Sequence, residues 1–219
     1  MTMNNSTLRI ITGFCIAASL WLLFFYFPPI ILSALCLIAM FGMLCELKSM
    51  ARSSKEFFML ALWYPIIPNS IIIYFNHTPD YRHLLFYLFA IVLSFDTGSY
   101  FSGKLCNKFW TTHKIIPTIS PGKSWEGFFG GLIKTILLMY LIIYHRNQTM
   151  SLSVIALTII ICCIAFAGDI FESYLKRRAR IKDSGIILPG HGGLLDRFDA
   201  ILFASYFFFI LKNYLVTIL

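Results

Sequence analysis

Long apolar runs separated by short polar segments make up most of the chain. An α-helix needs about 20 mostly apolar residues to cross the hydrocarbon core of a bilayer. Seven runs are of roughly that length: Leu8–Phe27, Pro29–Leu47, Glu56–Phe75, His83–Leu105, Trp125–Tyr144, Met150–Phe171 and Leu194–Leu219. Pro65 and Pro68 in the third run predict a kink or a break. The pattern therefore predicts an all-α fold, a polytopic membrane helix bundle of about seven transmembrane helices.

The composition agrees with lipid as the solvent for much of the chain. Apolar residues are 58% of the 219 residues and charged residues 13%, with a mean hydropathy of +0.77. Soluble domains are about 45–50% apolar and about 25% charged, so the composition argues against a soluble globule or a disordered chain. The six cysteines lie mostly within apolar runs and lack metal-type spacing, so we expect buried hydrophobes.

The chain carries a net charge of +8, from 18 Lys and Arg against 10 Asp and Glu. In a membrane protein this excess is typical of positive-inside topology, and it predicts no nucleic-acid partner. With the N-terminus in the cytoplasm, nearly all basic residues outside the runs fall on the cytoplasmic side, and only Arg82 and Arg146 fall outside. We therefore expect a cytoplasmic N-terminus and, from the compact size, a bacterial inner (cytoplasmic) membrane location.

The acidic residues divide the chain into two parts. All but Glu46, Glu56 and Asp80 lie from Asp96 onward, in or beside the last four runs and toward their cytoplasmic ends. Acids at membrane depth are costly and usually functional. We therefore predict scaffold helices over residues 1–80 and a catalytic half over residues 81–219, with its active site facing the cytoplasm.

Two acids, a hydroxyl and a lysine share one helix face at the end of the sixth run. Asp169, Glu172, Ser173 and Lys176 follow the spacing i, i+3, i+4, i+7. The face is either a solvated helix end with internal salt bridges or part of a site. The cationic stretch that follows, residues 176–182, would either touch anionic lipid or bind phosphate.

A glycine-rich loop comes before the last run. The sequence Pro189-Gly190-His191-Gly192-Gly193 suits a tight turn whose backbone N–H groups can hold phosphate oxygens beside a helix N-terminus. Asp196 and Asp199 then share one helix face. They could complement the helix dipole, but acids entering an apolar helix are costly unless they are paired or bind a metal, which favours a site.

Two shorter polar stretches lie upstream. Asp96, late in the fourth run, either pairs with a lysine such as Lys104 or belongs to a site, and Lys123-Ser124 opens the fifth run. A P-loop is excluded, because Pro117 stands where that motif needs glycine. Carboxylates, cations and a glycine loop on one side favour Mg²⁺ and phosphoryl or nucleotidyl transfer at the membrane surface.

The long polar stretch resembles a family signature. Ser173-Tyr174-Leu175-Lys176-Arg177, then Lys182-Asp183-Ser184-Gly185, then the stretch from Leu188 to Asp199 is similar to the signature of the phosphatidate cytidylyltransferases, also called CDP-diacylglycerol synthases. The segments 96–100 and 120–125 resemble that family's other recurrent stretches. The resemblance implies a multi-pass, homodimeric membrane enzyme that transfers CMP from CTP to phosphatidic acid, giving CDP-diacylglycerol and pyrophosphate in phospholipid biosynthesis. It also implies Mg²⁺, with K⁺ as an assisting ion, and many relatives carry more N-terminal helices.

The resemblance and the residue patterns together predict roles for individual residues. The predicted metal ligands are Asp169 and Asp196. The predicted catalytic residues are Ser173, Lys176, Arg177, Asp183, His191 and Asp199. The predicted substrate-binding residues are Asp96, Lys123, Ser124, Lys182, Gly192, Gly193 and Arg197.

Three other enzyme or transport functions and a lipid-binding scaffold stay open at this point. A CTP-dependent lipid kinase would transfer the γ-phosphate instead, and a CDP-archaeol-type synthase would differ only in its lipid. An ion-coupled transporter would place acids near the membrane midplane and show inverted repeats, whereas here the acids gather at one membrane face. A pure scaffold would not need Asp169, Asp196 and Asp199 together.

Overall fold

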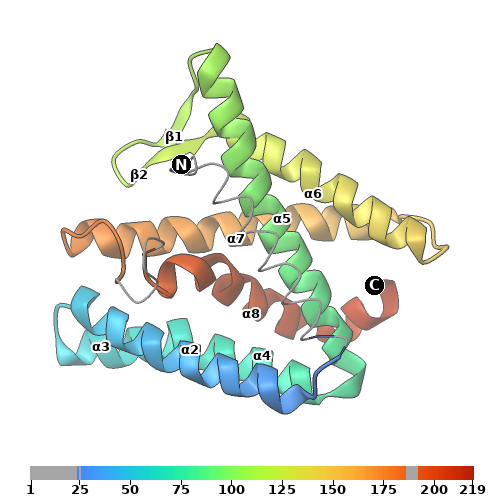
Figure 1. Cartoon of the computed structure of the whole chain (residues 1–219), viewed down its shortest axis with the longest axis horizontal. Coiled ribbons are helices and arrows are strands. Elements are labelled where there is room, and N and C mark those ends of the chain that lie inside the picture. The colour runs from blue at the N-terminus through green and yellow to red at the C-terminus, as the bar shows by residue number, and fades with distance from the viewer. Residues whose placement is uncertain (1–23, 25, 186–191) are drawn as a thin grey trace, which may run out of the picture.

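The computed structural model describes residues 24, 26–185 and 192–219 as a bundle of long helices with one small β-hairpin (Figure 1). The helices are α2 (Pro29–Met50), α3 (Ser54–Ala61), α4 (Ile67–His77), α5 (Pro79–Phe109), α6 (Trp125–His145), α7 (Leu152–Arg178) and α8 (Leu195–Ile218). A single π-helical turn, η1 (Leu62–Ile66), joins α3 to α4. Within the described ranges, 6 helical segments are long and apolar enough to cross a membrane. They confirm six of the predicted spans; the first, Leu8–Phe27, lies almost wholly outside the described residues.

The predicted irregularity in the third span is a change of helix type. The segment 54–77 stays helical throughout, and Pro65 lies inside η1. Proline has no N–H to donate, and its ring clashes with the preceding turn of an α-helix. One wider π turn accommodates it, and the side-chain amide of Asn69 donates to the Pro65 carbonyl over 2.7 Å.

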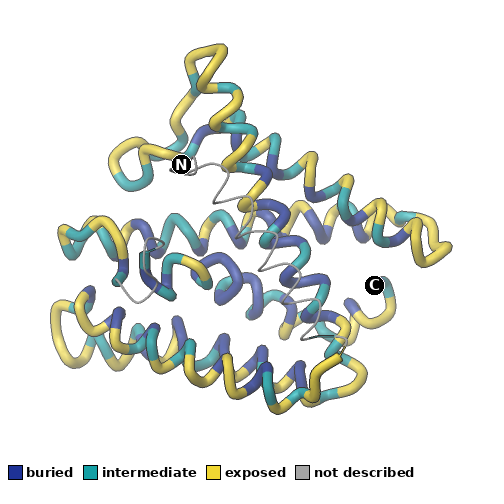
Figure 2. Tube along the Cα trace, in the orientation of Figure 1, coloured by how far each residue is buried: buried dark blue, intermediate teal, exposed yellow. Residues whose placement is uncertain are grey.

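Helix α5 is the longest element and packs against α4, α6, α7 and α8. Its contact with α6 is very close, because a Cβ added to Gly131 would lie 2.1 Å from the Ser99 hydroxyl oxygen. Figure 2 shows the buried residues facing the middle of the bundle and exposed residues along its outside. Many of the outward residues are large and apolar, such as Phe41 at 70% and Ile210 at 73% exposed, as expected for a surface covered by lipid.

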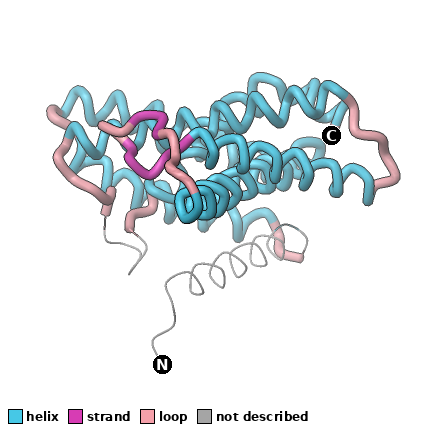
Figure 3. The backbone as a smooth tube through the Cα atoms, turned by 90° about the horizontal axis from the view of Figure 1, so that it is seen from above, coloured by secondary structure: helices cyan, strands magenta, loops and turns pink. Residues whose placement is uncertain are grey.

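The turns are concentrated at two ends of the bundle. We call the end that carries the α7–α8 connection the signature end. The antiparallel hairpin of β1 (Lys114–Ile116) and β2 (Ser120–Ser124) lies at the same end (Figures 1 and 3), which the side chain of Arg177 confirms by donating to the Ile119 carbonyl over 3.1 Å. The apolar pattern did not predict this hairpin, because its strands are short and polar.

Candidate active site

Lys176 joins α7 and α8, which carry the signature residues and which we call the signature helices. Its ammonium lies 2.5 Å from Glu172 Oε2, one turn back on α7, and also bonds Asp196 Oδ1 in the first turn of α8. The side chains of Lys176, Glu172 and Asp196 are 12%, 0% and 13% exposed. The predicted polar face of α7 is therefore a buried ion-pair network that continues into α8, and it is not a solvated helix end.

The other oxygen of Asp196 holds the connection between the helices. Oδ2 accepts from the backbone N–H of Ser184 at 3.0 Å and of Gly193 at 2.9 Å, and the Ser184 hydroxyl also lies 3.0 Å away. Gly192 has a φ of +82°, and a Cβ there would lie 2.9 Å from the same oxygen. Glycine fits this position because other residues rarely adopt that φ. We call Asp196 and these donors the Asp196 centre.

A second ion pair lies beside the Asp196 centre. Lys123, at the end of β2, lies 2.5 Å from Asp169 Oδ2 on α7, and its ammonium is 4.4 Å from the centre of the Phe166 ring. Asp96 of α5 experiences the charges of Asp169 and Lys123. Asp96 therefore lies near this ion pair, on an exposed part of α5, and its role in substrate binding stays a prediction.

Carboxylates outnumber cations in the cluster formed by the Asp196 centre and the neighbouring Lys123–Asp169 pair. Asp199, which is 7% exposed, is repelled by the charges of Asp169, Glu172 and Asp96, and it accepts a hydrogen bond from the adjacent Ala200 N–H over 2.8 Å. Glu172 Oε1 is buried and has no hydrogen-bond partner among the described residues. Hard, anionic oxygens in excess of their cations fit a divalent ion such as Mg²⁺. The described residues nevertheless contain no group of three or more ligands already gathered around one point.

The remaining predicted residues are distributed around this cluster. Ser173 is buried on α7, and the Ser124 hydroxyl caps α6 by accepting from Gly127 N–H over 3.2 Å. Lys182, Asp183, Arg177 and Arg197 are exposed at the signature end. His191 lies outside the described residues. The contacts of these residues with substrate stay predictions.

Sequence reasoning missed two buried residues from the first half of the chain. Glu46 of α2 accepts from the backbone N–H of Leu194 and Leu195, at 2.8 and 2.9 Å. Tyr64 of η1 packs its ring edge-on against Phe171 and experiences the charges of Asp199, Glu172 and Asp169. Its buried hydroxyl has no hydrogen-bond partner among the described residues. The one feature of the sequence that could have indicated Glu46 was the position of an acid near the end of the second apolar run. No feature of the sequence indicated Tyr64.

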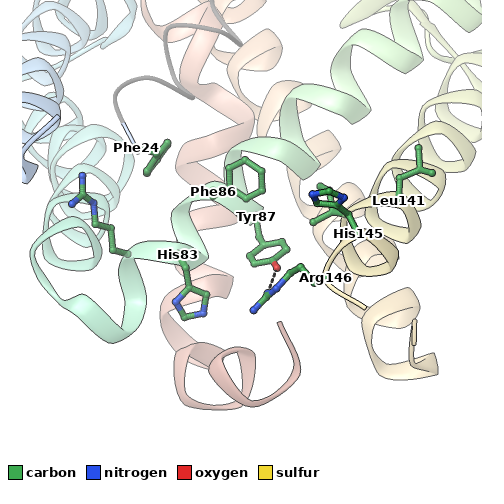
Figure 4. A pocket seen from close by; sticks show the side chains of 9 residues that line it. Phe24, His83, Phe86, Tyr87, Leu141, His145 and Arg146 are labelled. Carbon is green, nitrogen blue, oxygen red and sulfur yellow. Dashed lines mark hydrogen bonds between the residues drawn. The ribbon is translucent and has the colours of Figure 1, made fainter. Parts of the chain in front are cut away.

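A cavity of about 670 Å³ lies at the opposite end of the bundle (Figure 4). It is lined by the aromatic rings of Phe24, Phe86 and Tyr87 and by Arg82 and Arg146, among others, and Arg146 donates to the Tyr87 hydroxyl. The described residues that line it include no carboxylate. The cavity therefore lacks the ligands that a phosphate-bound divalent ion requires, and the signature end is the better candidate.

Comparison with known proteins points to one family. Residues 54–215 match the model of the cytidylyltransferase family. The chain is 36% identical to the phosphatidate cytidylyltransferase of Rickettsia bellii, over 97% of this chain and 93% of that protein. It is 34% identical to that of Rickettsia typhi, over 97% of this chain and 94% of that protein. The enzyme of Haemophilus influenzae is 41% identical over 61% of this chain, which spans about half of that longer relative.

Proposed function

The chain belongs to the cytidylyltransferase family and is a CTP-dependent nucleotidyltransferase, and we propose that the Asp196 centre is its active site. Its reaction is the transfer of CMP from CTP to phosphatidic acid, which gives CDP-diacylglycerol and pyrophosphate for phospholipid biosynthesis. One observation carries the assignment of the site. Lys176 and Asp196, from separate parts of the signature, meet in a buried network beside the Lys123–Asp169 pair.

Both substrates are polyanions, so the first task of the site is to supply positive charge. Lys123 and Lys176 lie inside the bundle end and Arg177 lies at its surface, all on the side that carries the α7–α8 connection. The phosphate of phosphatidic acid is already an anion and can attack the α-phosphorus of CTP in line, so no strong general base is needed. Lys176 and Arg177, with Lys182 and Arg197, would neutralise the departing pyrophosphate. Positioning and charge neutralisation do most of the work in such transfers.

The residues present fit the Mg²⁺ that the resemblance implies. Asp169 and Asp196 would hold the ion, because both lie at the acid-rich cluster where carboxylate charge exceeds its cationic partners. When bound, Mg²⁺ would supply charge neutralisation to the phosphates. In the structure, Lys123 pairs with Asp169 and Lys176 pairs with Asp196, so each proposed ligand has a cationic partner. The assisting K⁺ ion stays a prediction.

The setting of the enzyme follows from the same arrangement. The family's lipid substrate and the 6 apolar helical segments make this a multi-pass membrane protein. We place the signature end in the cytoplasm, where CTP is made, and the chain in the inner membrane of a bacterium. The positive-inside pattern supports this orientation. A homodimer is the assembly we expect.

A transfer assay tests the function. The purified protein is mixed in detergent micelles with Mg²⁺, phosphatidic acid and CTP labelled at the α-phosphate, and the lipids are then extracted. We expect the label to appear in the lipid phase while pyrophosphate is released, and we expect EDTA to abolish both. Label that enters lipid only from γ-labelled CTP would identify a lipid kinase instead. Transfer only to an isoprenoid lipid acceptor would identify a CDP-archaeol-type synthase.

A further inference from the structure

Glu46 has the properties of a residue that holds the active-site loop in place. It lies on α2, 138 residues before Ser184 in sequence, yet its carboxylate reaches the α7–α8 connection. Leu194 N–H donates to Oε1 over 2.8 Å, and Leu195 N–H donates to Oε2 over 2.9 Å. The side chain is 5% exposed. Burying a carboxylate is costly unless hydrogen bonds satisfy it, so these contacts need an explanation.

The two N–H groups that Glu46 binds belong to the start of α8. The first N–H groups of a helix have no partner within the helix and are usually satisfied by a capping side chain. Helix α8 has no side-chain cap of its own at Leu194. Glu46 therefore caps α8 from another helix, and its negative charge also suits the positive end of the helix dipole.

The cap is connected directly to the Asp196 centre. The Ser184 hydroxyl lies 3.0 Å from Glu46 Oε2 and 3.0 Å from Asp196 Oδ2, and it can donate to either carboxylate. Gly193 N–H binds Asp196, and the next two N–H groups along the chain bind Glu46. The two acids thus hold consecutive parts of one loop, so a displacement of Glu46 moves the donors that orient Asp196.

Two glycines of the signature make room for Glu46. For a Cβ added at Gly185, the three nearest atoms all belong to the Glu46 side chain, and Oε1 would lie 2.5 Å away. A Cβ added at Gly193 would lie 2.6 Å from Glu46 Oε2. Atoms at these separations overlap, so glycine at 185 is explained by the presence of this carboxylate.

We propose that Glu46 is a positioning residue of the transfer reaction, which caps α8 and orients Asp196 through the Ser184 hydroxyl and the backbone at 193–195. This inference rests on the proposed function of the Asp196 centre. Both carboxylate oxygens of Glu46 accept hydrogen bonds from the loop, so we assign it no contact with substrate. Its loss therefore lowers the turnover of folded enzyme, because Asp196 is misplaced, without removing any group that binds CTP.

The test combines two variants with a matched control. Glu46→Gln keeps the shape but directs an NH₂ donor at N–H and O–H donors. Gly185→Ala leaves the chemistry of Glu46 intact and pushes its side chain away from the loop. Glu56→Gln is the control, because Glu56 also pairs across helices at this end, with Arg178, and its partners in the described part of the chain do not include the loop.

Two readouts separate positioning from a purely structural role. We expect Glu46→Gln and Gly185→Ala to lower kcat per folded molecule by about 10- to 100-fold, which is the usual effect of losing a group that orients a metal ligand without binding the metal itself. The KM for CTP should change by less than about threefold. The second readout is amide hydrogen exchange without substrate or metal. The Leu194 and Leu195 amides should exchange at least about tenfold faster in Glu46→Gln, because they lose a charged acceptor. In Glu56→Gln the same amides should exchange at the wild-type rate.

The outcomes distinguish this inference from the proposed function. Wild-type protein that transfers no label to lipid would overturn the function itself. Active wild type, with wild-type kcat per folded molecule in Glu46→Gln, would overturn only the positioning role. If Glu46→Gln does not fold, Gly185→Ala decides: a lowered kcat in monodisperse protein supports the role, and unchanged kcat refutes it.

Discussion

Replacing Lys176 with methionine removes the cation that joins the two signature helices. Its ammonium lies 2.5 Å from Glu172 Oε2, and the Glu172 side chain is fully buried, with 0% exposed. The variant leaves that carboxylate without a counterion, whereas Asp196 keeps its backbone donors from Ser184 and Gly193. Removing one partner of a buried pair costs about 3–5 kcal/mol. We therefore expect Lys176→Met to be both less stable and inactive.

The expected shift can be measured by thermal unfolding in detergent, followed through the fluorescence of the four tryptophans. For chains of this length, 1 kcal/mol corresponds to roughly 2–4 °C in apparent Tm. Lys176→Met should therefore unfold roughly 6–20 °C below wild type. Lys108→Met is the control, because Lys108 is exposed at the end of α5 and should give no shift.

A double variant separates stability from chemistry. Lys176→Met combined with Glu172→Gln removes the uncompensated charge as well as the cation, so most of the lost stability should return. Turnover should stay absent, because the charge that neutralises pyrophosphate is still missing. A wild-type melting temperature for the single variant would refute the buried-pair reasoning. Recovered turnover in the double variant would show that Lys176 serves only to neutralise Glu172.

Two further substitutions test other parts of the site. Asp196→Asn should insert normally but lose at least about 100-fold in turnover, because it weakens both the Lys176 bond and the expected Mg²⁺ site; activity like that of wild type in the transfer assay would remove Asp196 from the metal role. Tyr64→Phe should keep the melting temperature, because its buried hydroxyl has no partner among the described residues, and should lower kcat/KM for phosphatidic acid by about 2- to 10-fold, the value of one hydrogen bond. Unchanged kinetics would mean that this hydroxyl does not contact substrate.

The helices could be predicted from the sequence because lipid imposes a simple rule on it. A span needs about 20 apolar residues whatever surrounds it, and six of the predicted spans are confirmed. The polar face of α7 was equally predictable, since helical spacing alone brings Glu172 and Lys176 together. The Lys176–Asp196 bond follows from neither rule. It depends on how α8 packs against α7, and only the family resemblance indicated that the two stretches belong together.

The contribution of Glu46 could not be predicted for a different physical reason. One carboxylate near the end of an apolar helix is typical of any membrane boundary, and its partners here are mostly backbone N–H groups, which every non-proline residue carries. No spacing rule links α2 to a loop 138 residues away. The loop, in turn, contains glycines, and the Glu46 carboxylate occupies the space that their side chains would need. A signature confined to the last two helices therefore depends on a helix outside it. Changes on α2 should be judged by their effect on turnover as well as on stability.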